Sequence, residues 1–164
     1  MVHSGRVRTR WLADEVANVS TVRDGSCTPV IEDHRLLERD YGDWEGLTWD
    51  EVFNENRESF HDLIHKPDTY RPPGGETTSE VQERVYEWFI EQTRAKHSLS
   101  VNADRREVVM AISHSGPAAA LAGKLLGLPA DQWNEWMLGY GNAIVMDVDM
   151  ANSVFQVTRW DLTS

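Results

Sequence analysis

The stretch Val108-Val109-Met110-Ala111-Ile112-Ser113-His114-Ser115-Gly116 combines the features of a strand with those of a helix start. Its first five residues form an unbroken apolar run rich in β-branched side chains, which is typical of a strand buried on both faces of a parallel sheet. Pro117 favours the first turn of a helix, and Gly127 suits the position just after its end at Leu126. The stretch therefore predicts a buried strand, a tight turn and a helix in direct succession.

Helical and strand patterns alternate along the rest of the chain. We expect helices over residues 8–17, over 49–64 behind a capping box of Thr48 and Glu51, and from Ser79 onward with Gln82 as its capping partner. We expect strands at 29–31, 143–148 and 154–160. This alternation predicts one α/β domain over residues 1–164, a three-layer sandwich with a mostly parallel central sheet and helices on both faces. The expected buried side of the helix over 49–64 consists of Val52, Phe53, Phe60, Leu63 and Ile64.

Composition narrows the class of protein. The chain has 164 residues and a formal net charge of -11, which argues against non-specific binding to nucleic acid or to an anionic membrane surface. Cys27 is the single cysteine, so the chain can form no internal disulfide and no cysteine-based metal site. With no long apolar run and no signal-peptide pattern, we expect a cytoplasmic protein that needs no metal or other cofactor.

Three segments suggest a site for an anion. His114 follows the carboxyl end of a strand and precedes a helix, where free N–H groups favour phosphate, although a histidine can also simply cap a turn. The loop Leu36–Gly46 alternates charges, aromatics and glycines, and is either functional or a solvated acidic loop. Arg6 and Arg8 lie at an expected helix start, where a cation is unfavourable unless an anion lies nearby; simple solvation is the alternative.

Together these segments resemble the histidine phosphatase superfamily, the phosphoglycerate mutase-like proteins. Ser4 to Ala13 is similar to the family block Ser-x-x-x-Arg-Ala-x-x-Thr-Ala, although Leu12 replaces the usual Thr. Leu37 to Gly46 is similar to Leu-x-Glu-x-x-x-Gly-x-Trp-Glu-Gly, and Pro73 to Glu76 to the start of Pro-Gly-Gly-Glu-Ser. Ser113 to Gly116 is similar to Ser-His-Gly-Gly.

The resemblance implies a phosphomonoesterase that acts on a small phosphorylated molecule through a phosphohistidine. It assigns Glu38 as the catalytic acid and base, and His114 as the second active-site histidine. It assigns phosphate binding to Arg8 and His114, and we add Ser115 at the start of the following helix. The substrate is left open, because residues between Gly46 and Pro73 carry no recognisable specificity pattern.

The family's nucleophile is missing from these residues. It lies in a Leu-x-Arg-His-Gly segment that ends the family's first strand, and no Arg-His-Gly tripeptide occurs in this sequence. His3 precedes the Ser of its block, so we reject it as a replacement. We therefore expect a chain that is incomplete at its N-terminus relative to the family. Because that strand lies near the middle of the family's sheet, its absence would leave two unpaired edges inside the sheet. Either the sheet closes up, a partner supplies the strand, or the native polypeptide is longer.

Three hypotheses follow from this absence. The chain is a phosphatase whose native polypeptide continues upstream, or a pseudophosphatase that binds a phosphorylated ligand or a protein without turnover. Alternatively, it is one part of a split enzyme whose partner chain supplies the strand. Its oligomeric state, including a homo-oligomer, is open.

Overall fold

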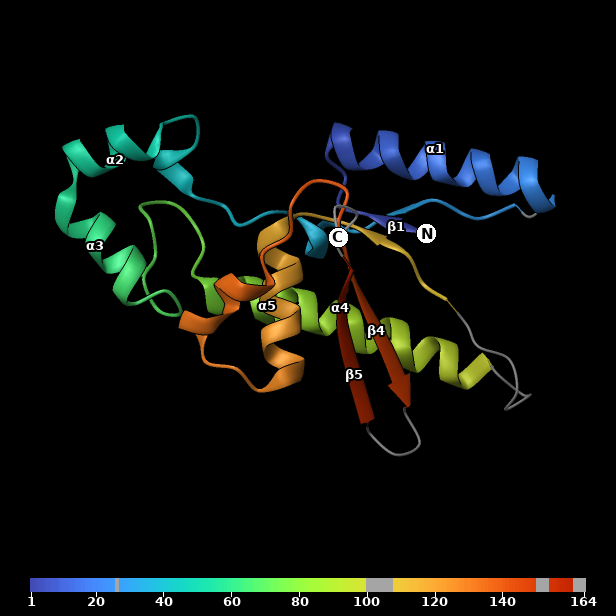
Figure 1. Ribbon diagram of the computed structural model, residues 1–164. Coiled ribbons are helices and arrows are strands. Elements are labelled where there is room, and N and C mark those ends of the chain that lie inside the picture. Colours follow the sequence, from blue (N-terminus) through green and yellow to red (C-terminus); the bar gives the residue numbers. More distant parts are fainter. Residues whose placement is uncertain (26, 100–107, 150–153, 161–164) are drawn as a thin grey trace.

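The computed structural model of the protein describes residues 1–25, 27–99, 108–149 and 154–160 (Figure 1). Its helices are α1 (Val7–Asp24), α2 (Trp49–Glu55), α3 (Arg57–His65), α4 (Thr78–Leu99) and α5 (Ser115–Leu126), with 3-10 turns η1 (His34–Leu36), η2 (Gly42–Trp44) and η3 (Ala130–Trp136). Its strands are β1 (Val2–His3), β2 (Ile31–Glu32), β3 (Ala111–Ile112), β4 (Ala143–Asp149) and β5 (Val154–Trp160). None of the described helices is long and apolar enough to cross a membrane.

The described strands form two sheets. In the first, β1 lies between β2 and β3 and is parallel to both, with Val2 opposite Ile31 on one side and Ala111 on the other. The second is an antiparallel hairpin of β4 and β5. Helix α1 contacts β1 and β3, while α4 and α5 pack together against the core (Figure 1). The predicted α/β fold, with a parallel sheet flanked by helices, is confirmed.

One apolar core joins the two sheets through the same helices. Val2 of β1 packs with Val85, Trp88 and Phe89 of α4, and with Leu121 of α5. Met146, Val148 and Phe155 of the hairpin pack against this same cluster, as does Val109 just before β3. The two sheets thus share a helix layer although no described hydrogen bond joins their strands.

The prediction that residues 108–112 are buried on both faces is wrong for the described structure. Val108 is 84% exposed and Met110 is 48% exposed, and only Ala111 and Ile112 are in a strand. The reason is that, within the described residues, β3 pairs along one edge only, with β1. Helix α1 also presents large apolar side chains to solvent, among them Trp11 at 65% exposure.

Helix boundaries differ from the expected ones for local reasons. Helix α1 continues to Asp24, because no helix-breaking residue occurs before Gly25, which ends it at a φ of 72°. The Thr48 capping box is confirmed, but Asn56 interrupts the helix that was expected to continue to residue 64. Of its five expected core residues only Val52 is buried. Phe53 and Phe60 instead pack edge to face with each other.

The second capping box is shifted relative to the prediction. Thr77 and Glu80 form it, with the Glu80 N–H donating to Thr77 Oγ1 at 3.1 Å and the Thr77 N–H donating to Glu80 Oε2 at 2.9 Å. Ser79 instead donates to the carbonyl of Asp68, and Gln82 donates to the carbonyl of Ala120. Both side chains therefore tie α4 to other elements.

The helix after β3 starts earlier than predicted. Helix α5 begins at Ser115, so Pro117 lies inside the first turn, and Gly127 ends the helix with a φ of 65° as predicted. Strand β2 is displaced to Ile31–Glu32 from the expected 29–31, whereas β4 and β5 start at the predicted residues.

The loop around Gly42 and the loop around Gly74 are hydrogen-bonded to each other. The Asp43 N–H donates to the carbonyl of Pro73 at 2.9 Å, and the Glu76 N–H donates to the carbonyl of Asp40 at 2.8 Å. Gly42 has a φ of 57° at this contact, and a Cβ there would collide with the backbone of Pro73, Gly74 and Gly75. This contact fixes the loop that carries Glu38.

Gly42→Ala is therefore expected to destabilise the protein more than Gly46→Ala. Gly46 also has a positive φ, of 86°, but a Cβ there meets nothing within 4 Å. Alanine at Gly46 should cost about 1 kcal/mol for the left-handed backbone, and alanine at Gly42 about 1–3 kcal/mol more for the collision. Denaturant unfolding of the two variants measures the difference. Equal losses would mean that the loops are not in contact as described.

Candidate active site

The site is built where β1 and β3 end side by side. Ser4 follows β1 and is fully buried, and His114 follows β3 as the N-cap of α5. Ser4 Oγ lies 2.9 Å from His114 Nε2, which joins segments 110 residues apart. Arg8, in the first turn of α1, places its Nη2 at 2.9 Å from His114 Nδ1. The structure thus brings together two of the predicted site residues, Arg8 and His114.

A second contact anchors Ser4 from the other side. Thr9 Oγ1 lies 2.9 Å from Ser4 Oγ and donates to the carbonyl of Arg6 at 2.8 Å. Thr9 is buried at 3% exposure, so this contact lies beneath the first turn of α1. Both ring nitrogens of His114 are therefore occupied by groups from residues 4–9.

Positive charge surrounds this imidazole. Burial is the main cause that lowers the pKa of His114 to about 4, and the charges of Arg8, Arg6 and Arg84 act in the same direction. A histidine with this pKa is neutral at pH 7. The site thus presents cationic guanidinium groups beside a neutral imidazole.

Glu38 approaches the same helix start from the loop after η1. Its Oε1 accepts from the Arg39 N–H at 3.0 Å, and a Cβ at Gly116 would collide with that oxygen. The glycine two residues after His114 therefore leaves room for the carboxylate. Arg84 of α4 holds the backbone of this loop, because its Nη2 donates to the carbonyl of Glu38 at 3.1 Å and its Nε donates to Glu76 Oε1 at 2.9 Å.

The hydroxyl of Ser115 is directed away from this cluster. Its oxygen accepts from the Leu138 N–H at 2.6 Å, and it lies 3.6 Å from the sulfur of Met137. The N–H groups of Ser115 and Gly116 lie in the first turn of α5, where a helix offers no internal acceptor. Phosphate binding by Ser115 stays a prediction, and it would involve the backbone N–H.

His3 occupies a different environment from His114. It is 4% exposed, and its Nδ1 accepts from the Gly5 N–H at 3.0 Å. Among the described residues, no group of three or more His, Cys, Asp or Glu side chains gathers as metal ligands would.

Sequence reasoning missed three residues that support the site. In the sequence, Ser4 is recognised only as the first residue of the block Ser4 to Ala13, and no sequence pattern singles out Thr9. Arg84 lies in the helix that was predicted from Ser79 onward, but nothing in the sequence indicates its bonds to the loop of Glu38. The hydrogen bonds of Thr9 exist only in the folded chain, so no sequence signal could have found them.

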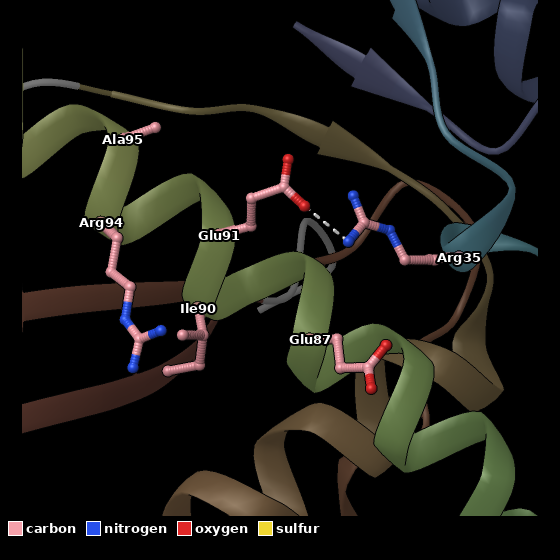
Figure 2. A pocket seen from close by; sticks show the side chains of 6 residues that line it. All are labelled: Arg35, Glu87, Ile90, Glu91, Arg94 and Ala95. Carbon is pink, nitrogen blue, oxygen red and sulfur yellow. Dashed lines mark hydrogen bonds and ion pairs between the residues drawn. The ribbon is translucent and has the colours of Figure 1, made fainter.

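An open groove lies along α4 (Figure 2). It has a volume of about 630 Å³ and is lined by Arg35, Glu87, Ile90, Glu91, Arg94 and Ala95. Arg35 Nη1 donates to Glu91 Oε2 at 2.7 Å across its rim. None of the candidate site residues lines the groove, so it is separate from the cluster at His114.

The lowered pKa of His114 predicts how stability depends on pH. Between about pH 6.5 and pH 4 the unfolded chain binds a proton that the folded chain does not, so this residue's contribution is lost as pH falls. His114→Gln removes that term and should show a smaller loss of stability from pH 7 to pH 5 than the wild type. Thermal unfolding at both pH values tests this, and equal losses would contradict the neutral state of His114.

The sequence of this chain is similar to those of known proteins. Residues 1–163 match the sequence profile of the histidine phosphatase superfamily (branch 1). Phosphoserine phosphatase 1 of Hydrogenobacter thermophilus is 29% identical over 156 residues, which cover 95% of this chain and 66% of that protein. The glucosyl-3-phosphoglycerate phosphatase of Mycolicibacterium vanbaalenii is 36% identical over 121 residues, which cover 73% of this chain and 52% of that protein.

Solved structures show the same fold. A mycobacterial glucosyl-3-phosphoglycerate phosphatase in complex with inorganic phosphate superposes with a TM-score of 0.76 and 25% identity, covering 98% of this chain and 75% of that one. YhfR of Bacillus stearothermophilus superposes with a TM-score of 0.70 and 27% identity, covering 96% and 71%. The chain spans between half and two thirds of the length of the two curated relatives described. It belongs to the histidine phosphatase superfamily, branch 1.

Proposed function

We propose that this chain supplies the phosphate-binding and proton-transfer groups of a phosphomonoesterase. Its substrate is a small phosphorylated metabolite, and the reaction proceeds through a phosphohistidine on a histidine outside residues 1–164. Arg8, His114 and the N–H groups at Ser115 bind the phosphoryl oxygens. Glu38 protonates the leaving oxygen and then activates the water that hydrolyses the phosphohistidine.

The observation that carries this proposal is the contact between Arg8 and His114 at the start of α5. A guanidinium and an imidazole meet there beside the first turn of α5, whose N–H groups lack internal acceptors, and this combination suits a phosphoryl group once Arg8 turns from Nδ1 to the anion. The carboxylate of Glu38 faces Gly116 at the same helix start. An acid and base is thereby held next to the anion site.

The relatives support a small phosphorylated substrate. Two of them are named for phosphoserine and for glucosyl-3-phosphoglycerate, which share a phosphomonoester on a small polar molecule. A solved relative contains inorganic phosphate, the product common to all such reactions.

The free strand edges of the described sheets support the proposal that a further strand completes them. Among the residues that the structure describes, the parallel sheet and the β4–β5 hairpin pack on the same helices without pairing to each other, and β3 pairs along one edge only. Val108 and Met110 lie exposed beside that edge. We propose that a further segment, bearing the nucleophile, inserts as a strand between β3 and the hairpin. A partner chain is one source of this segment, and pairing between two copies of this chain is an alternative.

A pseudophosphatase is the second candidate. The absence of Arg-His-Gly from the sequence favours it, because a chain that keeps Arg8 and His114 without a nucleophile would bind phosphate without turnover. The two candidates differ in what happens when a nucleophile is supplied.

Phosphate binding is the first test. Isothermal titration of this chain with inorganic phosphate is expected to show binding, and Arg8→Leu should weaken it roughly tenfold through loss of a charge-assisted hydrogen bond. Arg10→Leu is the matched control, because Arg10 lies further along α1 and pairs with Asp14. Equal affinity in both variants would remove Arg8 from the site.

Supplying the nucleophile is the second test. We expect no phosphate release from a panel of phosphomonoesters by the 164-residue chain. A fusion that adds the family's strand, Arg-His-Gly turn and helix upstream should release phosphate, and should lose it when the added histidine is replaced by alanine. In that fusion Glu38→Gln should lower kcat by roughly 10²–10⁴-fold. An inactive, well-folded fusion would favour the pseudophosphatase. His114-dependent turnover by the unfused chain would contradict the missing nucleophile.

A further inference from the structure

Counting the available protons assigns a donor and an acceptor to each hydrogen bond in the series Thr9, Ser4 and His114. Thr9 Oγ1 donates to the carbonyl of Arg6 at 2.8 Å, and a carbonyl can only accept. The same carbonyl also accepts from the backbone N–H groups of Thr9 and Arg10, at 3.0 and 2.9 Å. A hydroxyl has a single proton, and with that proton directed to Arg6, Thr9 Oγ1 accepts in its 2.9 Å contact with Ser4 Oγ. Ser4 is therefore the donor to Thr9.

The same count extends to the imidazole. Ser4 has used its only proton, so its oxygen must accept in the 2.9 Å contact with His114 Nε2. Nε2 therefore carries the proton of the neutral ring, and Nδ1 has a lone pair. The other end agrees independently, because the guanidinium of Arg8 can only donate, and it lies 2.9 Å from Nδ1.

We propose that Thr9 is a positioning residue for the phosphate site: through Ser4 it holds His114 in the Nε2–H tautomer, with Nδ1 as an acceptor beside Arg8. This inference rests on the proposed phosphate-binding role of Arg8 and His114. Thr9 and Ser4 are both buried, so water does not compete for the relay.

The tautomer of His114 determines whether a phosphate monoanion or dianion fits beside it. An anion that draws Arg8 to itself leaves the lone pair of Nδ1 without a donor. A dianion would then face that lone pair with lone pairs of its own, whereas a monoanion can donate its P–O–H proton to Nδ1. The charged groups that face His114 are Arg6 and Arg8 from the start of α1 and Arg84 from α4, with Glu38 next to Gly116. When no anion is bound, the positive charges of these three arginines disfavour a second proton on the imidazole. Binding at a pH where phosphate is mostly a dianion is therefore accompanied by uptake of a proton from solvent.

Nitrogen-15 NMR of the histidine rings tests the tautomer directly, with His114→Gln assigning the resonance. Arg8 also favours the Nε2–H form, so the comparison is made in an Arg8→Leu background. Arg8→Leu alone should retain Nε2–H. Adding Thr9→Val should raise the Nδ1–H population roughly tenfold, because Ser4 is then free to donate to Nε2. Adding Thr9→Ser instead should restore the Arg8→Leu spectrum, since serine keeps the hydroxyl.

Two results would overturn the relay. One is a wild-type His114 in the Nδ1–H form; the other is an Arg8→Leu/Thr9→Val spectrum identical to that of Arg8→Leu. Circular dichroism of each variant shows that it is folded, and the valine is nearly the same size as the threonine it replaces.

Phosphate titration tests the consequence for binding. Calorimetry at about pH 8 in two buffers of different ionisation enthalpy counts the protons taken up with inorganic phosphate. Wild type should take up close to one proton and Thr9→Val distinctly fewer; equal uptake would contradict the link between Thr9 and the bound species. Absence of phosphate binding in wild type would contradict the proposed function, while the NMR measurement still decides the relay.

Discussion

The parallel pairing of β1 with β3 is the constraint on which the site depends. Each strand is two residues long, and the register sets His3 opposite Ile112. Both segments therefore leave the sheet at the same edge, where Ser4 and His114 meet and where α1 and α5 begin. A slip of one residue would turn the side chains of β1 to the opposite face and separate these two residues.

The loop of Glu38 is held by a different kind of interaction, a network of hydrogen bonds from arginines to carbonyl groups. Arg39 is buried, and its guanidinium donates to the carbonyls of Tyr70 and Glu76 and to the hydroxyl of Thr78. Arg84 donates to the carbonyls of Arg35 and Glu38. Carbonyl groups in irregular loops lack partners from regular secondary structure, and unpaired buried ones are costly. The two arginines satisfy them and position the carboxylate of Glu38 through its backbone.

Features that depend only on neighbouring residues were predicted correctly from the sequence. The Thr48 capping box, the glycine that ends α5 and the two hairpin strands follow from neighbouring residues, and the structure confirms them. The family blocks, read from the sequence alone, also placed Arg8 and His114 in one site. Burial was predicted poorly, because it depends on distant partners. Phe53 and Phe60 have the spacing of a core face, but they pack against each other outside the core. Thr9 escaped notice because its role exists only after β1 and β3 pair.

The charged groups around His114 are mainly positive, whereas the protein as a whole is negative. The chain has a formal net charge of -11, yet the arginines Arg6, Arg8 and Arg84 surround a neutral imidazole. Glu38 lies at the same helix start and Glu76 pairs with Arg84, but Arg6 and Arg8 still act at short range, where they outweigh the screened carboxylates elsewhere in the chain. The same cations that help to lower the pKa of His114 attract an anion. Once the anion is bound, its charge offsets theirs and a proton can be held between the anion and Nδ1. The proposed anion binding and the proposed proton uptake at His114 would therefore both follow from one local field.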